Sequence, residues 1–177
     1  MTLRFFLVAL VAVCVPFVQA QKKTTQKQTT GKPGGTAQQV EATDRQRDFY
    51  QAGLESVGQV IQEAGGLMKM AESTAFNARD GRQQHLRLRK QVSALQANYG
   101  RFRASLNAEQ KRRVQSHLLG IEADRGRMNT HLQEISREMA RSSPDRTRIT
   151  HHAREVRDSG NSWQVRYRNM SSPLRLK

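Results

Sequence analysis

The segment LRKQVSALQANYGRFRASL, residues 88–106, spaces its large apolar residues alternately four and three positions apart. The residues in this series are Leu88, Val92, Leu95, Tyr99, Phe102 and Leu106. Such spacing brings side chains onto one face of an α-helix, and the intervening residues are mostly polar or basic. The segment therefore predicts an amphipathic helix that buries one stripe against other helices.

Three further runs with the same spacing flank this segment. They are Tyr50, Leu54, Val57, Ile61, Ala64, Met68, Ala71 and Ala75; then Val114, Leu118, Ile121, Arg125, Met128, Leu132, Ile135 and Met139; and finally Ile149, Ala153, Val156, Gly160, Trp163, Tyr167 and Met170. No stretch of the sequence alternates apolar and polar residues as a strand does. Because short connections make consecutive helices antiparallel neighbours, we predict an all-α fold, an antiparallel up-down four-helix bundle with coiled-coil-like 4-3 packing.

Turn and capping residues separate the four runs. The segment NARDG, residues 77–81, can end the first helix, because Gly81 tolerates a left-handed backbone. Asn107 and Gln110 have the spacing of a capping box, in which each side chain bonds the other residue's backbone amide. The segment SPD, residues 143–145, offers in order a cap, a proline at the first helical position and an acid near the positive helix end.

The first run is unusual in its glycines, since Gly53, Gly58, Gly65 and Gly66 all fall within it. An interior glycine costs a helix about 1 kcal/mol relative to alanine. Gly58 and Gly65 lie seven residues apart, so they share one face and could allow a neighbouring helix to approach closely. Alternatively, the adjacent pair Gly65-Gly66 kinks or breaks the helix, and we favour this second interpretation.

Arg125 occupies a core position of the third run. An arginine at such a position usually extends its guanidinium out of the seam or pairs with a neighbouring acid. A binding role inside the bundle is the alternative.

The first twenty residues have the three parts of a secretory signal peptide. Arg4 supplies the positive charge, residues 5–18 form an apolar run broken only by Pro16, and Val18-Gln19-Ala20 provides small residues before a cleavage site. The apolar run is shorter than the roughly 20 residues that span a membrane. We therefore predict that residues 1–20 are removed and that the protein is periplasmic or secreted, with no transmembrane segment left.

Two alternatives to cleavage remain, a retained signal-anchor and a lipoprotein that uses Cys14. Val13 argues against the lipoprotein, because a small residue is expected before the modified cysteine. Cys14 is the only cysteine, so removal of the signal leaves no disulfide, thiolate metal site or cysteine nucleophile.

Residues 21–43 carry four lysines, a Gly-Lys-Pro-Gly-Gly stretch and one large aliphatic residue, Val40. A segment of this composition buries too little apolar surface to offset its chain entropy. We predict that residues 21–43 are a disordered basic linker and that residues 44–177 form the helical bundle domain.

The charge of the chain is strongly asymmetric, within a formal net charge of +15. Residues 41–80 carry four basic and seven acidic residues, whereas residues 81–177 carry 21 basic and eight acidic ones. Such asymmetry predicts an anionic partner, an envelope surface or an acidic protein, although basic residues can also serve only to solvate helix faces. The predicted anion-binding surface comprises Arg101, Arg103, Lys111, Arg112 and Arg113, where the second and third helices join.

No motif of an enzyme class is present: no G-x-S-x-G elbow, phosphate-binding loop, dinucleotide fingerprint or H-E-x-x-H. We therefore predict a non-enzymatic protein without a cofactor. Trp163 and Tyr167 alternate with arginines as in single-strand nucleic-acid surfaces, but both fall on the core run and export disfavours such a partner. A loose resemblance of the last helix to b-type cytochromes implies no haem, because Gln164 stands near the position of the axial histidine.

Two H-x-x-E pairs, His131 with Glu134 and His152 with Glu155, have the residue types and spacing of a metal site. Each pair lies on one helical face. In an antiparallel hairpin that turns near Ser143, the two pairs are offset by about 4.5 Å. Two histidines and two carboxylates suit zinc or copper, whereas the alternative is pairing with the many nearby arginines.

The pentapeptide Leu106-Asn107-Ala108-Glu109-Gln110 resembles one copy of the L-T-x-x-Q motif of periplasmic stress chaperones. That resemblance implies a small, basic, all-helical envelope protein that binds unfolded proteins. Asn107 replaces the family's threonine, and no second copy is present. A chaperone-like function is thus the alternative to anion binding, and a metal-binding bundle is the third.

Overall fold

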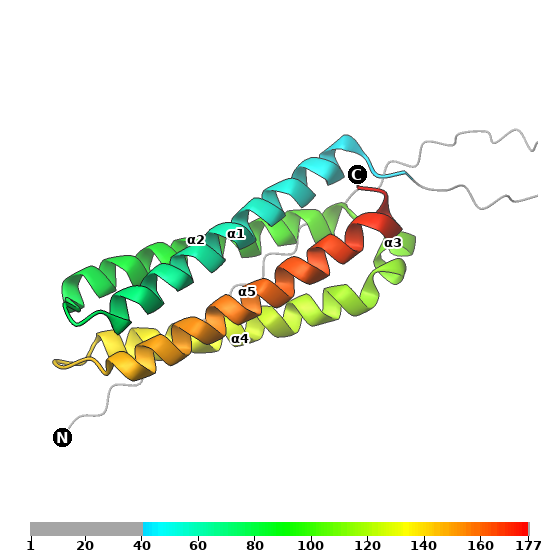
Figure 1. Ribbon diagram of the computed structural model, residues 1–177. Coiled ribbons are helices and arrows are strands. Elements are labelled where there is room, and N and C mark those ends of the chain that lie inside the picture. The colour runs from blue at the N-terminus through cyan, green and yellow to red at the C-terminus, as the bar shows by residue number, and fades with distance from the viewer. Residues whose placement is uncertain (1–40, 177) are drawn as a thin grey trace, which may run out of the picture. The chain divides into compact units, whose positions relative to one another are not determined.

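The computed structural model describes residues 41–176, which form four long helices and one short one (Figure 1). The helices are α1 (Asp44–Glu72), α2 (Ala78–Ser105), α3 (Ala108–Arg113), α4 (Gln115–Met139) and α5 (Arg146–Leu174). This part of the chain contains no strand, and the long helices run up and down as a bundle. The prediction of an all-α, antiparallel helical bundle is confirmed. The predicted signal peptide and residues 21–40 of the predicted linker lie outside the described residues.

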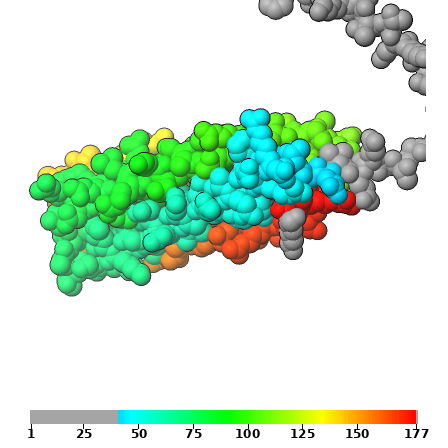
Figure 2. Space-filling model, turned by 90° about the horizontal axis from the view of Figure 1, so that it is seen from above, coloured from blue at the N-terminus to red at the C-terminus, as the bar shows by residue number. Residues whose placement is uncertain are grey.

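The four long helices do not pack equally against one another. α1 packs along α2 on one side and along α5 on the other, and α5 packs equally closely on α4. Figure 2 shows α1 and α2 side by side along the bundle. The α2–α4 edge has much the fewest close backbone approaches of the four. The bundle is therefore tight on three edges and loose on the fourth.

Glycines explain the tight α1–α5 edge. A Cβ atom on Gly53 of α1 would lie 2.5 Å from Cε1 of Tyr167, and one on Gly160 of α5 would lie 2.9 Å from Cγ1 of Ile61. Each helix thus offers a glycine to a side chain of the other, and only a bare backbone leaves room for these contacts.

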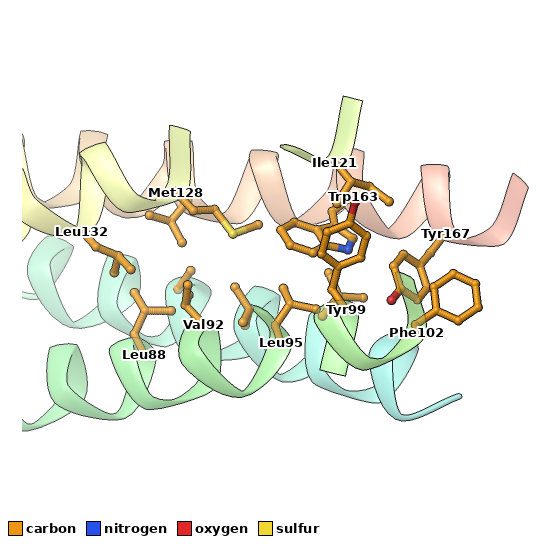
Figure 3. Packing of buried hydrophobic residues seen from close by; sticks show 14 of the residues in the cluster. Leu88, Val92, Leu95, Tyr99, Phe102, Ile121, Met128, Leu132, Trp163 and Tyr167 are labelled. Carbon is orange, nitrogen blue, oxygen red and sulfur yellow. The ribbon is translucent and has the colours of Figure 1, made fainter. Parts of the chain in front are cut away.

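The apolar runs of α2 and α5 are buried as predicted (Figure 3). Their aromatic residues meet in one cluster, in which the Tyr99 ring lies edge-on to Trp163 at 5.3 Å between centroids. The Tyr167 ring stacks on Tyr50 of α1 at 5.6 Å and tilts against Phe102 at 5.5 Å. Edge-on and offset arrangements of this kind add to the apolar area that the rings bury.

The predicted core run of α1 is partly wrong. Leu54 and Ile61 are only half buried, whereas Val60 and Leu67 are fully buried. Ala75 is exposed, since α1 ends at Glu72. A straight helix has 3.6 residues per turn, so over a long helix a strict 4-3 spacing drifts off the buried face.

The predicted break at Gly65-Gly66 is also wrong, because α1 runs uninterrupted from Asp44 to Glu72. The neighbouring residues Ala64, Leu67 and Met68 are buried and hold this turn in the bundle. Close approach at Gly58 and Gly65 is not found either: a Cβ atom on each would meet nothing within 4 Å.

Arg125 is not a core residue, which corrects the third predicted run. Its side chain is exposed and pairs with Glu122, Nη2 to Oε2 at 2.9 Å. The preceding residue, Asp124, is fully buried and accepts a hydrogen bond from Nε of Arg166 at 3.1 Å. Asp124 also pairs with Arg127 on its own helix. The pairing of Arg125 with a neighbouring acid is as predicted, but a buried carboxylate rather than Arg125 lies in the seam between α4 and α5.

At the starts of α2 and α5 the roles of the predicted turn and capping residues differ from those expected. Asn77 caps the start of α2, where its side chain accepts a hydrogen bond from the amide of Arg79 at 2.8 Å. Gly81 lies inside α2 with an ordinary helical backbone. At the start of α5 the cap is Asp145 rather than Ser143, so Pro144 precedes the helix.

Candidate functional site

The five residues of the predicted anion-binding surface do not form one surface. Arg101 lines a hollow of about 390 Å³ between the start of α1 and the end of α2, together with Arg45 and Phe49. Arg113 pairs with Glu109 one turn earlier. Arg101 and Arg103 are two residues apart on a helix, so their side chains leave it in nearly opposite directions.

The other three predicted residues, Arg103, Lys111 and Arg112, converge on a second hollow of about 290 Å³. This end hollow, as we name it, lies between α2, α3 and α4, and its remaining lining is Gln115, Leu118, Leu119 and Glu122. Arg103 donates to Glu122, Nη1 to Oε1 at 3.0 Å. No acid of residues 41–176 pairs with Lys111 or Arg112, so two free cations stand beside an apolar surface.

Helix α3 positions these two free cations. Its capping box is present as predicted: Asn107 accepts from the amide of Gln110 at 2.8 Å, and Gln110 accepts from the amide of Asn107 at 3.0 Å. The helix is only six residues long, because the backbone turns out of helical geometry at the buried residue Val114. Lys111 and Arg112 therefore lie on a short, capped element at the bundle's end.

The loose α2–α4 edge carries two further hollows, which the spacing of residues in the sequence does not predict. The middle hollow, about 450 Å³, is lined by Arg89, Val92, Ser93, Gln96, Asn129, Leu132, Gln133, Ser136 and Arg137. The far hollow, about 240 Å³, is lined by Arg82, His85, Leu86, Arg89, Ser136, Met139 and Ala140. These two hollows share Arg89 and Ser136, so they are continuous. Together with the end hollow they form what we call the α2–α4 groove.

The groove differs in chemistry along its length. Its two ends are apolar, with Leu86 61% exposed at the far hollow and Leu119 63% exposed at the end hollow. The middle is rich in amide and hydroxyl groups, and one of its contacts crosses between the helices, Gln96 Nε2 donating to Asn129 Oδ1 at 2.9 Å. The pattern is thus apolar, polar, apolar from one end to the other.

Basic side chains follow the whole groove. Arg82 donates to the backbone carbonyl of Met139 at 3.2 Å, which holds it against the far hollow. Within residues 41–176 Arg89 has no acidic partner, and Arg137 pairs with Glu134 outside the lining. The only acid that lines any of the three hollows is Glu122. The groove therefore favours an anionic occupant.

A buried histidine forms part of the far hollow. Nε2 of His85 lies 3.4 Å from the hydroxyl oxygen of Ser136. Burial lowers the pKa of His85, and the nearby Arg89 cation lowers it further, while a backbone hydrogen bond with Leu132 opposes both effects. A neutral imidazole is thus favoured at this end of the groove.

The predicted metal ligands come together only in part. Nδ1 of His131 lies 3.1 Å from Nδ1 of His152, and the ring of His151 lies 5.0 Å from that of His152. Oε2 of Glu155 is 3.9 Å from Nε2 of His131. Burial lowers the pKa of His152, and the neighbouring imidazoles lower it further.

Glu134, the fourth predicted ligand, pairs with Arg137, and its charge acts on His152 only as a smaller effect that raises the pKa. Within residues 41–176 no three His, Cys, Asp or Glu side chains are arranged to hold a metal ion. The structure therefore provides a pair of facing imidazoles with the Glu155 carboxylate 3.9 Å from one of them, rather than a complete four-ligand site.

Comparisons with family models, with curated proteins and with solved structures find no significant match to this chain. None of the helices within residues 41–176 has both the length and the apolar character needed to cross a bilayer.

Proposed function

We propose that this chain is an exported, non-enzymatic protein of the bacterial cell envelope that binds an anionic partner at the basic end of its bundle. The observation that carries the proposal is the end hollow, where Lys111 and Arg112 have no acidic partner in the described part of the chain and stand beside the exposed Leu119. The excess of basic residues after Gly81 supports an anionic partner. The signal-like residues 1–20 support export.

Binding of this kind depends on salt. Exposed charges are screened over about 10 Å at 0.1 M salt and about 3 Å at 1 M. The full chain should therefore bind anionic phospholipid vesicles or an acidic polymer such as poly-glutamate at low salt, and binding should fade as salt is added.

The double variant Lys111→Glu, Arg112→Glu tests the position of the site. Its matched control is Lys69→Glu, Lys90→Glu, which changes the net charge equally at exposed cations that have no ion pair among the described residues. The first variant should weaken binding to poly-glutamate far more than the control. Equal losses would show that net charge alone is responsible, and no binding by the wild type would reject the proposal.

A second candidate function is chaperone-like binding of unfolded envelope proteins. The observation that favours it is the exposure of three large apolar residues, Leu86, Leu119 and Val165. Such a protein should suppress the aggregation of a denatured model client, and that activity should persist at high salt, whereas electrostatic binding is lost.

A further inference from the structure

The lining residues of the three hollows follow one face of each helix. On α2 they recur no more than four residues apart from Arg82 to Gln96, and the next one is Arg103, seven residues later. On α4 they recur in the same way from Gln115 to Glu122 and from Asn129 to Ala140, again with seven residues between the two sets. That spacing marks a single stripe on a helix. The three hollows therefore lie along one edge of the bundle, and a separation of seven residues, about two helical turns, keeps the end hollow on the same face as the other two.

Two glycines lie between the middle hollow and the end hollow. Gly100 falls on α2 between the lining residues Gln96 and Arg103, and Gly126 falls on α4 between Glu122 and Asn129. Because Gln96 contacts Asn129 and Arg103 contacts Glu122, both glycines belong to the same short stretch of the edge.

Packing within the bundle does not explain these glycines. Each is exposed, and a Cβ atom added to either would meet nothing within 4 Å. A glycine in the middle of a helix is unfavourable relative to almost any other residue, so both sites carry a cost without a contact inside the molecule. What a missing side chain provides here is room for another backbone to approach closely.

The dimensions of the edge fit a short extended peptide. Leu86 in the far hollow and Arg103 in the end hollow are seventeen residues apart on α2, which corresponds to about 26 Å. An extended chain covers that distance in roughly eight residues at about 3.3 Å each.

The chemistry along the edge supports the same occupant. An extended segment leaves its backbone amides and carbonyls unpaired, and the side chains of Gln96, Asn129 and Gln133 offer both donors and acceptors. A helix pairs its own backbone and would instead need an apolar strip along its whole length. The two apolar hollows suit one apolar side chain near each end of the segment.

The charges that line the groove favour an acidic peptide segment over a basic one. Arg89, Lys111 and Arg112 face the groove without an acidic partner in the described part of the chain, and Glu122 is the sole acid of the lining. The chain's own residues 21–40 carry four lysines and no acid, so they are repelled rather than attracted.

We infer that the α2–α4 groove binds an extended acidic peptide segment of another protein, with an apolar side chain near each end seated in the far and end hollows and its backbone lying over Gly100 and Gly126. This inference rests on the proposed function and names the anionic partner as polypeptide rather than lipid or polymer.

The experiment uses the full chain and a fluorescein-labelled peptide of nine residues, with leucine at both ends and glutamates and serines between. The comparison peptide has the same composition with the two leucines adjacent at its centre. Fluorescence anisotropy should show that the first peptide binds about tenfold tighter, because only it can seat both leucines. Equal affinities would overturn the inference, while leaving charge-driven binding, and with it the proposed function, intact.

The glycines supply the sharper test. In the double variant Gly100→Gln, Gly126→Gln, a good helix former replaces each glycine, so the melting temperature should stay level or rise. Peptide affinity should nevertheless fall about tenfold, since two long side chains now occupy the space of the bound backbone. The matched control is Gly58→Gln, Gly65→Gln, at two positions of α1 where an added Cβ atom likewise meets nothing within 4 Å, and it should leave the affinity unchanged.

The other results of these experiments would either overturn the inference alone or overturn the proposed function with it. Undiminished binding by the Gly100→Gln, Gly126→Gln variant would overturn it. Tighter binding of a twenty-residue acidic amphipathic helix than of the extended peptide would also overturn it. If the wild type binds anionic vesicles or poly-glutamate but neither nine-residue peptide, the inference fails and the proposed function stands. If the wild type binds none of these probes, both fail.

Discussion

Gln46 and Gln110 hydrogen-bond to each other through their side-chain amides although 64 residues separate them. Nε2 of Gln46 donates to Oε1 of Gln110 at 3.0 Å, and the reverse bond measures 3.4 Å. Both residues also complete capping boxes: Oε1 of Gln46 accepts from the amide of Thr43, as Oε1 of Gln110 does from that of Asn107. The starts of α1 and α3 are thus joined through two buried glutamines.

Replacing Gln110 by alanine should destabilise the protein by about 2 kcal/mol, since it removes a cap and leaves the buried Gln46 without its partner. Urea denaturation of the full chain measures this loss. A double-mutant cycle with Gln46→Ala should give a coupling of about 1 kcal/mol. The exposed residue Gln51 provides the control, since Gln51→Ala should change the free energy of unfolding by less than about 0.5 kcal/mol. Additive effects of Gln46→Ala and Gln110→Ala would contradict the pairing.

Replacing Asp124 by alanine should cost about 2 kcal/mol, because the change removes a buried carboxylate that accepts charge-assisted hydrogen bonds from Arg166 and Arg127, both of which keep some contact with solvent. Arg125→Ala should change stability by less than about 0.5 kcal/mol, as expected for an exposed ion pair. Chemical denaturation of the two neighbouring variants compares them directly. A similar cost for both would show that Arg125 is as important to the bundle as Asp124.

His85 should make the stability of the bundle depend on pH. Burial lowers its pKa in the folded protein below the ordinary value of 6.5, so the unfolded chain takes up a proton at higher pH. The free energy of unfolding therefore falls as the pH drops through 6.5 toward the folded-state pKa. Urea denaturation should give a lower free energy of unfolding near pH 5.5 than near pH 7.5.

The variant His85→Gln should reduce this difference between the two pH values. Lys90→Gln, a change of an exposed cation on the same helix, should leave the difference as in the wild type. If His85→Gln shows the full wild-type difference, the pH dependence has another origin.

Zinc or copper provides a test of the histidine pair. If the facing imidazoles of His131 and His152 bind a metal, either ion should raise the melting temperature of the wild type but not of a His131→Ala, His152→Ala variant. Glu155→Gln should weaken the effect, whereas Glu134→Gln should not, because Glu134 is held by Arg137. Equal shifts in the wild type and the double-histidine variant would show that the effect of the metal is nonspecific.

Local patterns were sufficient to predict the secondary structure and much of the core. The runs of α2 and α5 are buried throughout, and the capping box of Asn107 and Gln110 is present. Helical periodicity and capping involve residues within about one turn of each other, so they can be read directly from the sequence. The same periodicity of 100° per residue could also have separated Arg101 from Arg103.

Other features depend on residues that are distant in sequence. Asp124 rather than Arg125 is buried because Arg166 on α5 lies opposite it. α1 stays helical through Gly65-Gly66 because its neighbours bury the surrounding turn, and its end is capped from another helix, with Nε of Arg146 donating to the carbonyl of Ala71 at 2.8 Å. Spacing within one run contains no information on these partners.

The position of the groove was decided by the tertiary structure alone. Amino-acid spacing predicts four amphipathic helices, but it does not say which pair remains apart. Gly53 and Gly160 bring α1 and α5 together, whereas polar pairs such as Gln96 with Asn129 bridge α2 and α4. Glycines permit close backbone approach and long polar side chains hold helices apart, so the open edge follows from how all four helices pack at once.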